Sequence, residues 1–219
     1  MNILVLDTSN YNPEFCYYEN GGIVIQKKLY SENNADSLIY SIIESFKESG
    51  RKIGNIEILA YSNGPGSFTG LRVGSAAAKG ICTASGCRFI ELNSLDIIAE
   101  KFRLNIAREC TAVALIPMNS RTNEFYFAVY DIYKDNLKRI GDYGISGFEQ
   151  INTGNKVLLI NDKTEGISET DNITDLSEYY SAEAMYSLTQ LKIIGNEYNN
   201  YRNSEPYYMK DFVPLKKKF

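Results

Sequence analysis

A block of eleven residues with four glycines constrains this sequence more than any other feature. It reads Gly64-Pro65-Gly66-Ser67-Phe68-Thr69-Gly70-Leu71-Arg72-Val73-Gly74 and follows a run of buried-strand character at residues 57–61. Its first three residues predict a turn, because glycine and proline adopt the backbone angles that tight turns need. Ser67 is the expected N-cap of a helix that continues to about residue 85.

Small residues recur every four positions in this predicted helix. Gly70, Gly74 and Ala78 therefore lie on one helical face. Glycine inside a helix costs about 1 kcal/mol relative to alanine, so Gly70, Gly74 and Gly80 need a compensating contact. A face of this kind predicts the close approach of another helix or of a backbone segment.

The rest of the chain predicts an α/β arrangement of mixed sheets flanked by helices. We expect a first half at 1–105 and a second half at 106–219, with a final segment from Tyr198 that crosses back over the first half. The strands of the first half are expected at 2–7, 14–18, 23–30, 57–61 and 88–91, and its helices at 35–49, 68–85 and 95–102. The second half is expected to hold strands at 111–117, 124–132 and 156–160, a turn and short strand at 134–144, a polar loop at 164–174 and a helix at 182–194.

The composition argues against several kinds of chemistry. The chain has no histidine, and its four cysteines form no C-x-x-C pair, which disfavours a zinc site and a histidine-dependent catalytic triad. The net charge of −4 disfavours broad contact with a nucleic-acid backbone. Apolar runs are too short to cross a bilayer and no secretory signal precedes them, so we expect a cytoplasmic protein without membrane contact.

Polar residues at the end of the first predicted strand suggest a cleft for an anion. Asp7-Thr8-Ser9 follows the strand, and the glycine turn opens a helix whose N-terminal N–H groups attract negative charge. Each signal also fits a plain cap or a plain turn. The candidate cleft residues are Asp7, Thr8, Ser9, Gly64, Gly66, Ser67, Thr69, Asn119 and Arg121.

The cleft lacks the charges that phosphoryl transfer requires. A second acidic group should follow the strand at 111–117, but Asn119 stands in this region and carries no charge to draw a divalent cation. We therefore predict no catalytic residue, no metal site and no required cofactor, with at most weak or vestigial nucleotide binding.

Two helices could form a docking face for another protein. Apolar residues cover a wide arc of the helix at 35–49, and the small-residue helix should lie beside it. The alternative is that these residues pack on their own sheet. The candidate partner-binding residues are Leu38, Ile39, Ile42, Ile43, Phe46, Gly70, Arg72, Val73, Gly74, Ala77 and Ala78.

These motifs together resemble the TsaB (YeaZ) family. The resemblance rests on Asp7-Thr8-Ser9, the glycine block, Arg121-x-x-Glu124-x-Tyr126 and the tail Pro206-Tyr207-Tyr208-Met209-Lys210. It implies an actin-like (ASKHA) fold of two ribonuclease-H-like halves. It also implies pairing with a catalytic TsaD-like paralogue and a TsaE-like ATPase in the transfer of a threonylcarbamoyl group to the adenosine beside the tRNA anticodon, with tRNA reached indirectly through the complex.

The chain departs from the family pattern at two positions. Asn34 lies where the family usually has a histidine, and Asn119 lies where it usually has an acidic residue. Both departures favour a non-catalytic scaffold or activator. Two alternatives remain open: an ATP-dependent enzyme that uses Asp7 and the glycine loop, and a homodimer that associates through the same helices.

Overall fold

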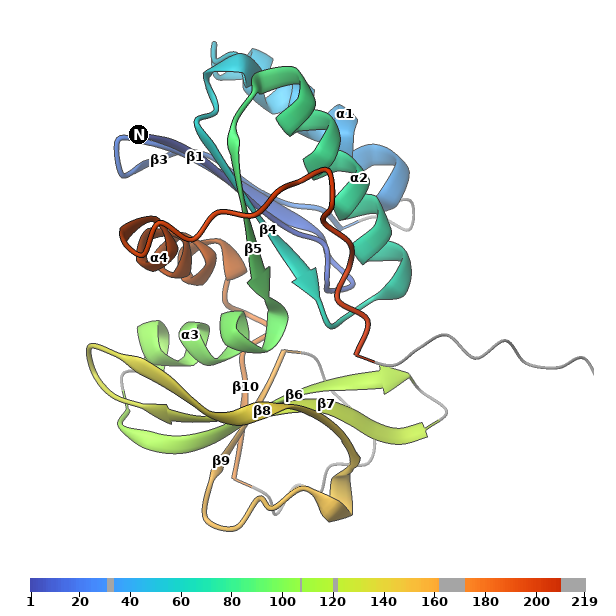
Figure 1. Ribbon diagram of the computed structural model, residues 1–219, viewed down its shortest axis with the longest axis vertical. Helices are drawn as coiled ribbons and strands as arrows, with labels where there is room; N and C mark the ends of the chain where they lie inside the picture. The colour runs from blue at the N-terminus through green and yellow to red at the C-terminus, as the bar shows by residue number, and fades with distance from the viewer. Residues whose placement is uncertain (31–33, 107, 120–121, 162–171, 210–219) are drawn as a thin grey trace, which may run out of the picture.

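The structure is a computed structural model that describes residues 1–30, 34–106, 108–119, 122–161 and 172–209. It contains two five-stranded sheets, one in each half of the chain, with helices above and between them (Figure 1). No helix in these ranges is both long and apolar enough to cross a lipid bilayer.

The first sheet is mixed and has the strand order β3-β2-β1-β4-β5. A turn with positive φ angles at Asn20 and Gly21 joins β2 to β3, which confirms the expected hairpin. The central strand β1 pairs antiparallel with β2 and parallel with β4. The strands are β1 (Asn2–Asp7), β2 (Glu14–Glu19), β3 (Gly22–Lys28), β4 (Ile58–Gly64) and β5 (Arg88–Asn93).

Two helices cover each face of this sheet. Alternate residues of β1 point to opposite faces, and Leu4 and Leu6 pack with α1 (Asn34–Glu48) and α2 (Phe68–Ser85). Ile3 and Val5 pack on the other face with α3 (Ser94–Ile106) and α4 (Ser181–Ile194). Gly86 ends α2 in the left-handed conformation, as its position in the sequence predicts.

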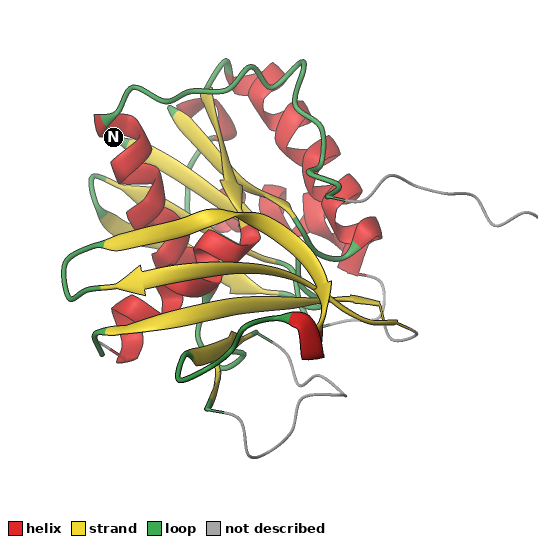
Figure 2. Cartoon of the chain, turned by 60° about the horizontal axis from the view of Figure 1, so that its bottom comes forward, coloured by secondary structure: helices red, strands yellow, loops and turns green. Residues whose placement is uncertain are grey.

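The second sheet has the order β10-β9-β6-β7-β8 and shares α3 with the first. Leu95, Ile98 and Phe102 of α3 pack against β6, while Ile97 packs against the first sheet. Figure 2 shows this second sheet from its outer side. Its strands are β6 (Cys110–Asn119), β7 (Thr122–Ile132), β8 (Leu137–Gly147), β9 (Val157–Ile160) and β10 (Ile173–Asp175), and short 3₁₀ turns occur at η1 (Ile53–Asn55) and η2 (Phe148–Gln150).

The second half differs from expectation in two elements. β8 is eleven residues long instead of a short strand, because it pairs along most of β7. β10 forms at the end of the region expected to be a polar loop, where it pairs with β9. The short, weakly apolar sequence Ile173–Asp175 gives little sign of a strand, so tertiary pairing decides its conformation.

The chain after α4 runs back across the first half. Phe89 of β5 and Asn199 form an antiparallel bridge, and the Tyr207 N–H donates to the Asn63 carbonyl at 2.7 Å. In Figure 1 this red segment passes over β5 and descends along α2. α4 itself packs on the first sheet, so the first sheet is covered in part by elements of the second half. The division at residue 105 stays a prediction.

The stripe of small residues on α2 faces the chain's own backbone. A Cβ atom added at Gly70 would overlap the carbonyl oxygen of Thr8, and one added at Gly74 would overlap the Thr8 side chain. The prediction of a close backbone approach is therefore confirmed. The prediction that this stripe leaves room for a foreign helix is wrong, because the loop between β1 and β2 already occupies the space.

Most of the apolar residues proposed for partner docking are also buried within the chain. They pack on the face of the first sheet that α1 and α2 cover, so their prediction as an open docking face is wrong. These buried residues are Leu38, Ile42, Phe46, Ala77 and Ala78. Ile39 and Ile43 remain exposed on α1, Arg72 remains exposed on α2, and Val73 is half-buried.

We predict opposite stability effects for two glycines of the same helix. Gly74→Ala should lower the free energy of unfolding by about 2 kcal/mol, because the new methyl group overlaps Thr8 in a packed site. Gly80→Ala should raise it by up to about 1 kcal/mol, because Gly80 has open space around it and alanine favours the helix. Urea denaturation measures both. Equal stability of the two variants would contradict the packing described here.

Candidate functional site

The loop after β1 is held together by the Asp7 carboxylate. Its Oδ1 accepts from the Ser9 N–H at 2.9 Å and the Ser9 hydroxyl at 2.7 Å, and its Oδ2 accepts from the Asn10 amide at 2.9 Å. Asp7 is only 2% exposed. Both carboxylate oxygens are thus engaged in bracing the loop.

The same loop meets the start of α2. The Ser67 N–H donates to the Ser9 carbonyl at 2.8 Å, and the Ser67 hydroxyl accepts from the Gly70 N–H at 3.2 Å. This confirms Ser67 as the N-cap. Two N–H groups at the positive end of the helix are therefore satisfied by the chain itself, at the place where an anion was expected.

A cleft of about 280 Å³ lies between this helix start and the second sheet. Ser9, Gly66 and Ser67 line one side of it, and Ile116 and Pro117 of β6 line the other. The structure thus brings part of the predicted cleft together.

The other predicted cleft residues have different surroundings. Asp7 and Thr8 are buried behind the cleft, and Thr69 is exposed beside it. Gly64 packs against Leu71 and the Tyr207 carbonyl. Asn119 ends β6, where its backbone pairs with that of Thr122. Arg121 lies outside the described residues.

Aromatic residues form the rim of this cleft. The rings of Phe68 and Tyr208 lie 5.5 Å apart, and the Arg72 guanidinium lies 4.0 Å from the centre of the Phe68 ring. Arg72 also donates to the Tyr208 hydroxyl at 3.3 Å. The sequence predicts Arg72 as a partner-binding residue and does not single out Phe68. The stacking depends on the returning tail, which no local pattern near Phe68 could reveal.

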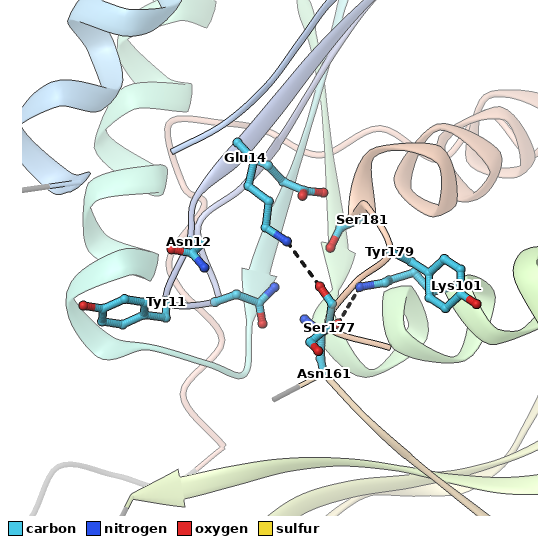
Figure 3. Close-up of a pocket in the computed structure, with 10 residues that line it drawn as sticks. Tyr11, Asn12, Glu14, Lys101, Asn161, Ser177, Tyr179 and Ser181 are labelled. Atoms are coloured by element: carbon cyan, nitrogen blue, oxygen red, sulfur yellow. Dashed lines mark hydrogen bonds between the residues drawn. The ribbon is translucent and has the colours of Figure 1, made fainter. Parts of the chain in front are cut away.

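A second cavity, missed by the sequence reasoning, lies on the other side of the Asp7 loop (Figure 3). Glu14 and Lys101, which are 3% and 1% exposed, line it together with the half-buried Lys28. Glu14 begins β2 opposite Lys28 at the end of β3. Lys101 lies on the buried face of α3 beside Phe102. A lysine within an apolar stripe of a helix is the sequence feature that could have indicated this buried charge.

Burial shifts both charged groups toward their neutral forms. Desolvation, together with the charge of Asp7, raises the pKa of Glu14 to about 7, although Lys101 and Lys28 oppose this shift. Desolvation lowers the pKa of Lys101 to about 8, and the charges of Glu14 and Asp7 oppose it. Such a pair of perturbed groups in a cavity marks a candidate functional site.

The two helix-covered mixed sheets define a two-half α/β protein of the actin-like class, as expected. The solved structure of YeaZ from Pseudomonas aeruginosa has this fold. It matches with a TM-score of 0.79 and 19% sequence identity, over 94% of this chain and 100% of that chain.

Residues 5–192 match the family described as TsaD, tRNA N6-adenosine threonylcarbamoyltransferase. The chain belongs to this family, and the resemblance to its TsaB (YeaZ) members is confirmed. TsaB of Haemophilus influenzae, described as a tRNA threonylcarbamoyladenosine biosynthesis protein, is 29% identical over 129 residues, which are 58% of this chain and 53% of that protein. TsaB of Escherichia coli, described in the same words, is 28% identical over 131 residues, which are 59% and 55%. The chain spans about half the length of these curated relatives.

We predict that the Glu14 carboxylate makes folding stability depend on pH. Its pKa in the folded state, about 7, lies above the ordinary value of 4.5. The folded chain therefore holds this proton more tightly, and stability falls as pH rises from 4.5 to 7. Glu14→Gln removes the titration, so the variant should gain stability relative to the wild type between about pH 5 and 7.5, on the order of 1–2 kcal/mol.

Urea denaturation at several pH values measures this gain, with the exposed Glu183→Gln as the control for loss of a surface carboxylate. Lys101 has the opposite effect at higher pH. Because its pKa in the folded state, about 8, lies below the ordinary value of 10.5, the free energy of unfolding rises as pH rises from about 8 to 10.5. A constant difference between Glu14→Gln and the wild type across this range would contradict the prediction.

Proposed function

We propose that this chain is a non-catalytic subunit in the biosynthesis of threonylcarbamoyladenosine in tRNA, where it pairs with a TsaD-like catalytic paralogue. The names of its relatives and its family membership support the pathway. The surface of the α1–α2 layer supports the pairing, and it is the observation on which the proposal chiefly rests.

That surface is apolar on α1 and flat on α2. Ile39, Tyr40 and Ile43 are 40%, 67% and 46% exposed on α1. On α2, Ala76, Gly80 and Thr83 are exposed at helical spacing, and Gly80 has no neighbouring atom within 4 Å of an added Cβ. We call these six residues the outer helix surface. Exposed apolar side chains beside a row of small residues suit the packing of helices from another protein.

The outer helix surface differs from the docking face expected from the sequence. The small residues that hold α2 against the β1–β2 loop are Gly70 and Gly74, whereas Ala76 and Gly80 lie on the exposed side. Ile39 and Ile43 belong both to the outer helix surface and to the partner-binding residues predicted from the sequence. The helix therefore presents small residues on two sides, one for its own fold and one for a partner.

The cleft supports a non-catalytic role. Asp7 is engaged by its own loop, so its oxygens are not open to a metal ion without rearrangement. The Ser9 carbonyl occupies the Ser67 N–H at the start of α2. The alternative of an ATP-dependent enzyme would need this loop to move aside, and nucleotide binding at the cleft stays a prediction that calorimetry with ATP and Mg²⁺ tests.

Further partners follow from the same proposal. We expect a TsaE-like ATPase in the assembly, and tRNA to be held mainly by other subunits, because the net charge of −4 disfavours direct binding to a phosphate backbone. A second copy of the chain is the alternative occupant of the outer helix surface when the paralogue is absent.

The test places a large side chain on the outer helix surface. Gly80→Arg should leave the fold intact, because the position is open, and should weaken capture of the TsaD-like paralogue of the same organism by at least about tenfold. Asn155→Arg, an exposed loop position in the second half, adds the same charge elsewhere and should bind normally. Pull-down and calorimetry measure binding, and circular dichroism checks the fold.

Two further measurements separate the alternatives. Reconstitution of the tRNA modification should require the wild-type chain and fail with Gly80→Arg. Light scattering of the chain alone tests for a homodimer. If the wild type is a dimer and Gly80→Arg is a monomer, the dimer forms through the outer helix surface. Full capture of the paralogue by a folded Gly80→Arg variant would reject the outer helix surface as the docking site.

A further inference from the structure

The cavity that contains Glu14 is built from both halves of the chain. Glu14 comes from β2, Lys28 from β3 and Lys101 from α3, while Asn161 follows β9 and Ser177 precedes α4. Its volume is about 70 Å³, enough for a small molecule or a few waters. Figure 3 shows Glu14, Lys101, Asn161 and Ser177 gathered around it.

Each charged group in the cavity keeps unused hydrogen-bonding capacity. Oε1 of Glu14 is buried and has no partner among the described residues. Lys28 donates one hydrogen bond, to the Ser177 carbonyl at 3.3 Å, and Lys101 donates one, to the Asn161 side chain. An ammonium group has three donors, so two on each lysine have no hydrogen-bond partner among the described residues. The Lys28 ammonium also lies 5.7 Å from the centre of the Tyr180 ring.

The opposite charges do not neutralise each other by direct contact. In the part of the chain that the structure describes, no ion pair within 4.0 Å joins either lysine to Glu14. Burying charges without a direct partner costs several kcal/mol, and a contacting pair would cost less. The nearby Asp7 does not serve as the direct partner of either lysine, because its oxygens accept hydrogen bonds from residues of its own loop. An occupant that touches both signs of charge would offset this cost.

The lining restricts the chemistry of that occupant. Two lysines repel a cation. The Glu14 carboxylate, whose ionised form Lys28 and Lys101 favour, repels an anion that carries no hydrogen-bond donor. A molecule with a carboxylate at one end and an ammonium at the other satisfies both sides. We propose that this cavity binds a small zwitterionic α-amino acid, its carboxylate on Lys28 and Lys101 and its ammonium on Glu14. This inference goes beyond the proposed function and does not depend on it.

The first experiment compares probes on the full wild-type chain. Glycine and L-serine are titrated into ¹⁵N-labelled protein, with acetate, methylammonium and inorganic phosphate as comparators. We expect saturable shifts of the amides near Glu14 and Ser181 with the amino acids, and binding of acetate and methylammonium at least about tenfold weaker. Water alone in the cavity predicts no saturable shift with any probe up to about 10 mM, and this result would overturn the proposal.

The second experiment uses variants that separate the two charges. Glu14→Gln should weaken glycine at least about tenfold and leave acetate unchanged or tighter, because only the ammonium partner is lost. Lys28→Met should weaken both glycine and acetate, whereas Lys27→Met, the exposed neighbour on β3, should change neither. Circular dichroism melts check that each variant folds. Phosphate or acetate that binds the wild type as tightly as glycine would reject a zwitterion site.

Discussion

The contact between the β1–β2 loop and the glycine face of α2 is the constraint on which the first half depends. Thr8 and Ser9 lie so close to the helix that Gly66, Gly70 and Gly74 have no room for a side chain. The Asp7 carboxylate holds the loop through three hydrogen bonds. The Ser9 carbonyl in turn accepts from the Ser67 N–H at the start of α2. The central strand and α2 are therefore locked together by backbone contacts, which tolerate less adjustment than contacts between flexible side chains.

The two halves are joined by shared elements more than by a linker. α3 packs on both sheets, and α4, although it belongs to the second half in sequence, covers the first sheet. The tail then returns to β5 and α2, where Tyr208 meets Phe68 and Arg72. Sequence order thus gives a poor account of which residues share a core, because each half completes its packing with a segment from the other.

The regular elements of the first half follow from local signals. The apolar run at 3–6, the Asn20-Gly21 turn and the Ser67 cap act over a few residues, so pattern and turn chemistry predict them well. The direction of the small-residue face was harder to predict, because spacing shows that Gly70 and Gly74 share a side but not what faces it. The Glu14–Lys101 cavity was missed for a related reason, since its members lie 87 residues apart in the sequence and meet only through tertiary packing.

Small residues on two sides of α2 have different physical consequences. At Gly74 the neighbour is the chain's own Thr8, and a side chain there competes with folding. At Gly80 an added Cβ would meet no atom of the described residues within 4 Å, so no such contact offsets its helix cost of about 1 kcal/mol. Under the proposed function, a contact with a partner outside the monomer would account for this glycine. In that proposal, the exposed Ala76, Ile39 and Ile43 belong to the surface on which helices of the partner pack.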